Sequence, residues 1–189
     1  PPRRPNRKPP RKPSTIRGEP QDALEQDLLC PFHYYGISDN TDLRDVEWSA
    51  GQYSPGALSA LYTGNDARTL LTLKALRAKV LDPSRMRALG FCVSVAHAEY
   101  MAKAFSAQGL PSAAIVGTTD PDQRRALVEQ LRLGDLRCIF TVDVFNEGVD
   151  IPSVDVVLML RPTASLSIWR FGGHRILRLG ASSIAVGSQ

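Results

Sequence analysis

The stretch from Arg137 to Arg178 constrains the fold of this chain more than any other part of the sequence. It opens with a short apolar run, Cys138 to Val142, that is rich in residues favouring β-strands. A polar, glycine-containing loop follows, and then comes a second apolar run, Val154 to Leu160. Both runs are typical of buried strands. We predict that the segment after them is helical and carries Arg175 and Arg178.

Strand and helix patterns alternate before this stretch as well. Phe91 to Val95 and Ala113 to Gly117 predict strands. The helix expected between them has an apolar face formed by Ala98, Met101, Ala102 and Phe105. A second helix is expected from Pro121 to about Leu133, where Gly134 can supply a left-handed residue. Continuous apolar strands alternating with helices predict an α/β fold, in which a parallel sheet carries helices on both faces.

Two further helices are expected on the amino-terminal side of this unit. Ser54 and Pro55 open a helix that runs through Tyr62. Asp66 is positioned to cap a second helix, which Pro83 stops. We expect the apolar side of that second helix to be buried and its basic residues to be solvated. The apolar residues are Leu70, Leu73, Leu76 and Val80, and the basic ones are Arg68, Lys74, Arg77 and Lys79.

The basic character of the chain belongs to one end. The net charge is +4, but residues 1–20 hold seven of the 23 basic residues, one of the 19 acidic residues and seven prolines. The remainder is therefore slightly acidic. Such a Pro/Arg composition forms neither a helix nor a core, so we expect residues 1–20 to be a disordered basic tail, from a truncated or non-native start.

Several function classes find no support in the residues. Cys30, Cys92 and Cys138 are far apart, which favours buried free thiols in a reducing compartment. His33 has no second ligand nearby, so we interpret it as a packing residue and expect no metal site. No apolar run approaches 18 residues, and the sequence predicts a cytoplasmic protein without membrane contact.

The residues from Leu28 to Trp169 resemble the second RecA-like domain of superfamily 2 helicases and translocases, of the bacterial DEAD/DEAH type. The block TVDVFNEGVDIPSVDVVLMLRPTASLSIW carries the resemblance, because it is similar to helicase motif V and its continuation. The resemblance implies a RecA-like fold and an ATP-dependent motor. In parallel sheets, the loops at the carboxyl ends of the strands form the working edge, where these motifs would meet.

The resemblance assigns nucleic-acid contacts to two places on that edge. Ser94 to His97 looks like motif IV, where helix-start amides approach a sugar-phosphate backbone, although an ordinary strand-to-helix turn has the same pattern. In motif V, Thr141 offers a hydroxyl to a phosphate and Asn146 shapes the loop. These residues imply DNA or RNA as partner, bound without sequence preference.

The resemblance also implies half of a nucleotide site. Gly148 permits close backbone approach, and Asp150 can accept hydrogen bonds from a ribose or an arginine. Arg175 and Arg178 fall on the arginine positions of motif VI and would neutralise charge on a γ-phosphate. Phe171 and His174 stand where that motif has Gln and Gly, so either the motif has diverged or the reading frame has slipped.

The other half of such a motor is missing from the sequence. No GxxxxGK[ST] loop and no DExx pair occurs, so ATP and Mg²⁺ would bind only together with a first RecA-like domain. We divide the chain into a tail (1–20), an entry segment with flanking helices (21–88), the RecA-like domain (89–180) and a second tail (181–189). The expected function is the C-terminal half of a helicase or translocase, present as a fragment. The alternatives are a non-enzymatic protein that binds nucleic acid through its basic arm and an inactive gene remnant.

Overall fold

The computed structural model of the chain describes residues 32–37, 41–49, 52–142, 154–162, 177–178 and 183–187. The elements within these ranges are β1 (Phe32–Gly36), β2 (Trp48–Ser49), β3 (Gln52–Tyr53), α2 (Pro55–Tyr62), α3 (Asp66–Lys79), β4 (Ala88–Phe91), α4 (Val95–Ala107), β5 (Ser112–Ile115), α5 (Pro121–Leu133), β6 (Cys138–Thr141), β7 (Val156–Met159), β8 (Leu177–Arg178) and β9 (Ser183–Gly187).

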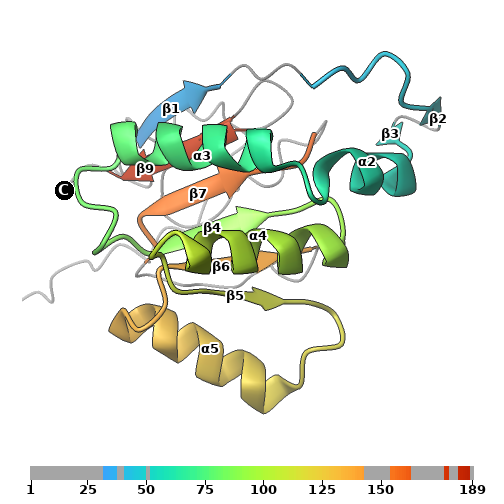
Figure 1. The fold of residues 1–189 in the computed structure, drawn as a ribbon. Helices are drawn as coiled ribbons and strands as arrows, with labels where there is room; N and C mark the ends of the chain where they lie inside the picture. The colour runs from blue at the N-terminus through green and yellow to red at the C-terminus, as the bar shows by residue number, and fades with distance from the viewer. Residues whose placement is uncertain are drawn as a thin grey trace, which may run out of the picture.

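The main sheet has the strand order β1-β9-β8-β7-β4-β6-β5. Strands β8, β7, β4, β6 and β5 are parallel, and β9 is antiparallel to its neighbours. From β4 the chain passes β6 to reach β5 and then returns to β6. Right-handed crossovers in these opposite directions place α4 and α5 on opposite faces of the sheet. Figure 1 shows α3 beside α4 in front of the sheet. The predicted α/β fold is confirmed.

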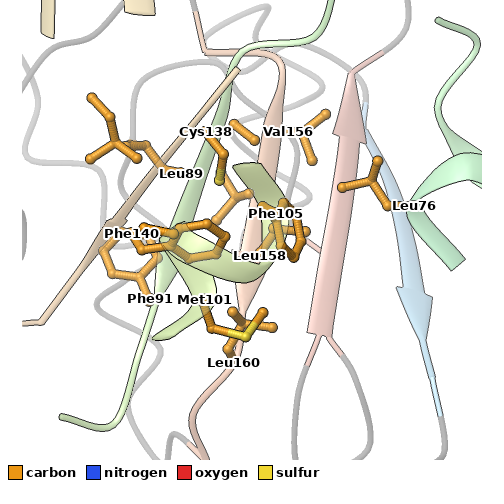
Figure 2. Close-up of a cluster of buried hydrophobic side chains, with 14 of the residues drawn as sticks. Leu76, Leu89, Phe91, Met101, Phe105, Cys138, Phe140, Val156, Leu158 and Leu160 are labelled. Carbon is orange, nitrogen blue, oxygen red and sulfur yellow. The ribbon is translucent and has the colours of Figure 1, made fainter. Parts of the chain in front are cut away.

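The core lies between β4, β6, β7 and helix α4, and every residue of these three strands is buried. The helix face predicted from the sequence is buried as expected, with Ala98, Met101 and Phe105 at 2% exposure or less. The ring of Phe105 meets that of Phe140 edge-to-face, with centroids 4.9 Å apart (Figure 2). Cys92 and Cys138 are buried free thiols, as predicted, and burial raises the pKa of both.

Helix α3 differs from the prediction in three respects. Its N-cap is Asn65, whose side chain accepts a hydrogen bond from the Arg68 amide at 3.0 Å, so Asp66 is the first helical residue rather than the cap. Leu70 was expected in the core but is 56% exposed. Arg68 was expected in solvent but is buried, with its guanidinium carbon 4.1 Å from the centroid of the Tyr62 ring. Leu73, Leu76 and Val80 are buried as predicted, so the buried side of α3 is the predicted one with Arg68 in place of Leu70.

Other boundaries also shift. Strand β4 begins at Ala88 and ends at Phe91, where we expected the strand to begin, because its amides pair with β6 and β7 from Ala88 onward. The segment expected to be helical up to Arg178 contains strand β8, and the expected tail at 181–189 contains β9. In the described part of the chain, no helix is both long and apolar enough to span a membrane.

Candidate nucleic-acid-binding edge

The carboxyl ends of the parallel strands form one edge, which we call the working edge. Pairing brings Phe91 of β4 level with Thr141 of β6 and with Met159 of β7. Ser94 follows β4 by three residues, and Thr141 is the last residue of the neighbouring strand. In Figure 1 the arrowheads of β4, β5 and β7 point to this edge, where α4 begins and α2 lies. Two predicted contact residues, Ser94 and Thr141, therefore belong to adjacent strand ends.

Ser94 organises the start of α4. Its hydroxyl accepts a hydrogen bond from the His97 amide at 3.1 Å, so it is the N-cap of the helix. The same oxygen lies 2.7 Å from the hydroxyl oxygen of Ser59, which belongs to α2. Ser94 thereby ties α2 to the working edge. Its side chain is only partly buried, so it lies within reach of a ligand there.

His97 has a side chain that is enclosed by the fold. Its side chain is 1% exposed, and its Nδ1 accepts a hydrogen bond from the Val93 amide at 3.4 Å. Burial, and secondarily the charge of Arg68, lowers the pKa of His97 to about 3, so the ring is neutral at physiological pH. A buried neutral imidazole offers neither surface nor charge to a phosphate. The imidazole packs the start of α4 against Tyr62, and the contact expected at His97 through the amides of the helix start stays a prediction.

Thr141 and Arg124 share an unusual property. The Thr141 Oγ1 and Arg124 Nε atoms are buried and have no hydrogen-bond partner among the described residues, a property that Tyr62 Oη and Thr63 Oγ1 at the end of α2 also have. Arg124 lies in the first turn of α5, which starts after β5, and Ile115 of β5 pairs with Thr141. Both atoms therefore belong to the working edge. A buried polar atom without a partner costs about 1–3 kcal/mol, so each such atom calls for an explanation, and a ligand is one of them.

Sequence reasoning missed Arg124, although a signal for it exists. Counting back from the buried Leu131, the partly buried Val128 and Leu127 continue one helix stripe, and Arg124 occupies its next position. A basic residue on the apolar stripe of a helix, one turn from the carboxyl edge of a sheet, marks a guanidinium held at that edge.

The remaining predicted site residues are only partly placed. Asn146, Gly148, Asp150 and Arg175 lie outside the described residues. Arg178 lies in β8, where its backbone pairs with Met159 and is therefore level with Thr141. Strands β7 and β4 separate the two, which puts their backbones about 14 Å apart at about 4.8 Å per strand. No group of three His, Cys, Asp or Glu side chains that could hold a metal occurs in the described ranges.

Comparison with known proteins agrees with this arrangement. Residues 71–180 match the family described as "Helicase conserved C-terminal domain". The chain is 25% identical over 147 residues to "Putative ATP-dependent helicase IRC3" of Saccharomyces cerevisiae, covering 78% of this chain and 21% of that protein. It is also 25% identical over 152 residues to a "51.5 kDa protein" of a Lactococcus phage, covering 79% of this chain and 32% of that protein. The chain thus spans a third or less of the length of these relatives.

Solved structures give a weaker likeness. A structure of S. cerevisiae Dbp5 bound to RNA and ADP BeF3 has a TM-score of 0.41 at 22% identity, covering 49% of this chain and 23% of that chain. The Hef helicase domain of Pyrococcus furiosus has a TM-score of 0.38 at 19% identity, covering 49% and 19%. The assignment rests instead on the family match. Because that match covers more than half of its length, the chain belongs to the family of helicase conserved C-terminal domains.

Proposed function

We propose that this chain is the C-terminal half of an ATP-dependent motor that holds the sugar-phosphate backbone of DNA or RNA along the working edge. The observation that carries the proposal is the pair of buried, unpartnered polar atoms, Thr141 Oγ1 and Arg124 Nε, at adjacent elements of one edge. A hydroxyl and a guanidinium are both donors, and phosphate oxygens accept from both. Because both atoms are buried, a phosphate reaches them only when the residues that cover them move aside. Such contacts carry no base identity, so binding should be independent of sequence and should weaken with salt.

Binding to single strands tests this proposal. We expect Thr141→Val and Arg124→Gln each to weaken the affinity for a labelled oligonucleotide by about tenfold, since a hydrogen bond to a charged group contributes about 1.5–3 kcal/mol. Fluorescence anisotropy over a series of salt concentrations provides the measurement, with DNA and RNA strands of the same sequence. The matched control is Arg125→Gln, because Arg125 is the exposed neighbour on α5 and pairs with Asp122.

Two outcomes would contradict the proposal. If Arg125→Gln weakens binding as much as Arg124→Gln, the effect is one of net charge and not of the edge. If all binding disappears on removal of residues 1–20, the affinity belongs to the basic arm, and the chain is a non-enzymatic protein that binds nucleic acid through this arm. Salt-sensitive binding that survives this removal and is lost on changing Thr141 supports the motor edge.

The nucleotide half of the proposal concerns ATP and Mg²⁺. Gly148, Asp150, Arg175 and Arg178 are the residues of this chain that would face the nucleotide, and a first RecA-like domain would supply the phosphate loop and the Mg²⁺ ligands. When bound, ATP supplies the hydrolysis that drives movement. This chain would contribute arginines that neutralise charge on the γ-phosphate and a loop, residues 146–150, between nucleotide and nucleic acid.

From this division of roles we expect no ATP hydrolysis by the chain alone. The measurement is phosphate release from purified protein with Mg-ATP, with and without single-stranded nucleic acid, and the expected rate equals that of buffer. Steady release that Arg175→Ala abolishes would mean that this chain holds a complete site. Release that persists in Arg175→Ala would indicate a contaminating enzyme and would leave the expectation standing.

A further inference from the structure

A groove at the end of the molecule near the working edge has no role in the proposed function. It is a cavity of about 970 Å³ between the loop at residues 41–46, helix α2 and the first turns of α3. Its lining is largely apolar, with Val46, Ala57 and Leu71 among the contributing side chains, and Asp42 and Asp45 stand on the loop side. We call it the acidic groove.

An aromatic pair, Trp48 and the half-buried Tyr53, continues from the same loop. Trp48 on β2 is 55% exposed, and its ring meets the ring of Tyr53 on β3 edge-to-face with centroids 4.6 Å apart. The hairpin is fixed to the start of α2, because the Ser54 amide donates to the Glu47 carbonyl at 2.9 Å. Figure 1 shows the hairpin and α2 together at the end of the sheet to which the parallel strands point.

The charges around the groove and hairpin are mainly negative. Residues 41–68 contain four acidic and two basic side chains. Arg44 is paired with Asp42, and Arg68 lines the groove but is buried against Tyr62, so among the described residues the exposed unpaired charges are those of Asp45 and Glu47. Asp45 and Glu47 are exposed and form no ion pair within the ranges that the structure describes. Phosphates are repelled from such a surface, whereas a cation is attracted to it.

The combination of features defines the chemistry of the occupant. Exposed aromatic rings bind proline rings and stack with guanidinium groups, and carboxylates form paired hydrogen bonds with arginine. A basic, proline-rich segment can form all three contacts: proline on aromatic ring, guanidinium on aromatic ring, and arginine to carboxylate. Residues 1–20, which lie outside the described residues, hold seven basic residues and seven prolines. We propose that this segment docks in the acidic groove and on the Trp48 and Tyr53 hairpin of its own chain.

The connection is long enough for this. Strand β1 is antiparallel to β9, and β9 is antiparallel to β7, so β1 runs toward the working edge. Phe32, the first residue of β1, therefore lies at the end of the strand that is away from this edge. The five residues of β1 cover about 17 Å. The 11 residues between the segment and Phe32 span up to about 36 Å when extended, which exceeds the length of the strand. Docking in this place would withdraw the basic arm from nucleic acid until a phosphate backbone competes for it.

Accessibility of Trp48 tests the docking in the absence of nucleic acid. The chain has two tryptophans, Trp48 and Trp169, so a Trp169→Phe background leaves Trp48 as the reporter. We expect acrylamide to quench Trp48 about twofold less in the full chain than in a chain lacking residues 1–20, because docking removes water from the ring. About 1 M NaCl, where the Debye length is about 3 Å, and the double change Asp45→Asn with Glu47→Gln should each abolish the difference.

The controls separate this inference from the proposed function. Glu99→Gln changes an exposed carboxylate on α4 and should leave quenching unaltered. A synthetic peptide of residues 1–20, added to the shortened chain, should restore protection. Equal quenching of the full and shortened chains overturns the proposal, and so does a difference that the Asp45 and Glu47 changes leave intact. Neither outcome depends on Thr141 or Arg124, so the nucleic-acid proposal can fail or succeed independently.

Discussion

Replacing Gly90 by alanine is expected to lower the free energy of unfolding by about 1–3 kcal/mol, the usual cost of overpacking a core. Gly90 lies in the central strand β4 and is paired with Phe140 of β6. A β-carbon on Gly90 would lie 2.3 Å from Cδ1 and 2.6 Å from Cε1 of the Phe140 ring. The ring is confined, because Phe105 packs edge-to-face against it from α4. The conflict therefore requires movement of the helix or of the strands.

Urea unfolding followed by circular dichroism measures this effect. Gly56→Ala is the matched control, since Gly56 is a helical residue with nothing within 4 Å of an added β-carbon. That change should be neutral or stabilising by up to about 1 kcal/mol, the difference in helix propensity. Adding Phe140→Leu to Gly90→Ala should recover part of the loss through favourable coupling between the two sites. If the two alanine variants are equally stable, the core can absorb the extra carbon and the packing argument fails.

The sequence predicts the helices that pack on the sheet better than the flanking one. On α4, four apolar residues repeat with helical spacing and the face they predict is buried. On α5, Gly134 takes the left-handed conformation, with φ at 86°, as the sequence predicted. Local chemistry determines these features, so a pattern of neighbouring residues suffices to find them.

Helix α3 shows where such patterns fail. Leu73, Leu76 and Val80 of the predicted apolar stripe are buried as expected, but Leu70 is exposed and the helix turns Arg68 inward. Arg68 is stabilised inside by the Tyr62 ring and by a hydrogen bond to the Thr41 hydroxyl at 3.3 Å. These partners come from other elements, and no spacing rule within α3 contains them. The same limit explains β8, because a two-residue strand next to β7 is determined by its partner rather than by its own sequence.

The candidate site was found by one kind of signal and missed by another. Thr141 was predicted because motif V ends a strand, and the structure does place it at the end of β6. The lack of a hydrogen-bond partner for the Thr141 hydroxyl, and likewise for Arg124 Nε, among the described residues can be recognised only from the structure, where the partners of each polar atom are known. His97 was predicted as a contact residue because it lies in the first turn of a helix. The burial of its side chain depends on α2, which the motif does not include.

His97 is expected to make the fold sensitive to mild acid. Its pKa is about 3 in the folded chain and about 6.5 when the chain is unfolded. Above the unfolded value both states are neutral and pH has no effect. Below about pH 6.5 the unfolded chain binds a proton at His97 and the folded chain does not. The free energy of unfolding therefore falls by about 1.4 kcal/mol per pH unit until the folded pKa is reached. The expected loss at pH 5 is about 2 kcal/mol.

In the window from about pH 6.5 to about pH 5 the carboxylates still carry their charge, so a variant at His97 has to be compared with wild type to separate it from the other two histidines, His33 and His174. His97→Asn is the informative variant, since its amide oxygen can accept from the Val93 amide as Nδ1 does. We expect His97→Asn to be less stable than wild type at neutral pH. Its free energy of unfolding should stay nearly constant across the window, whereas that of wild type falls as the pH is lowered. Gly56→Ala alters no titratable group and should keep the wild-type slope. Parallel declines of wild type and His97→Asn would mean that another group binds the proton, and that the imidazole is less enclosed by Tyr62 and Arg68 than its 1% exposure implies.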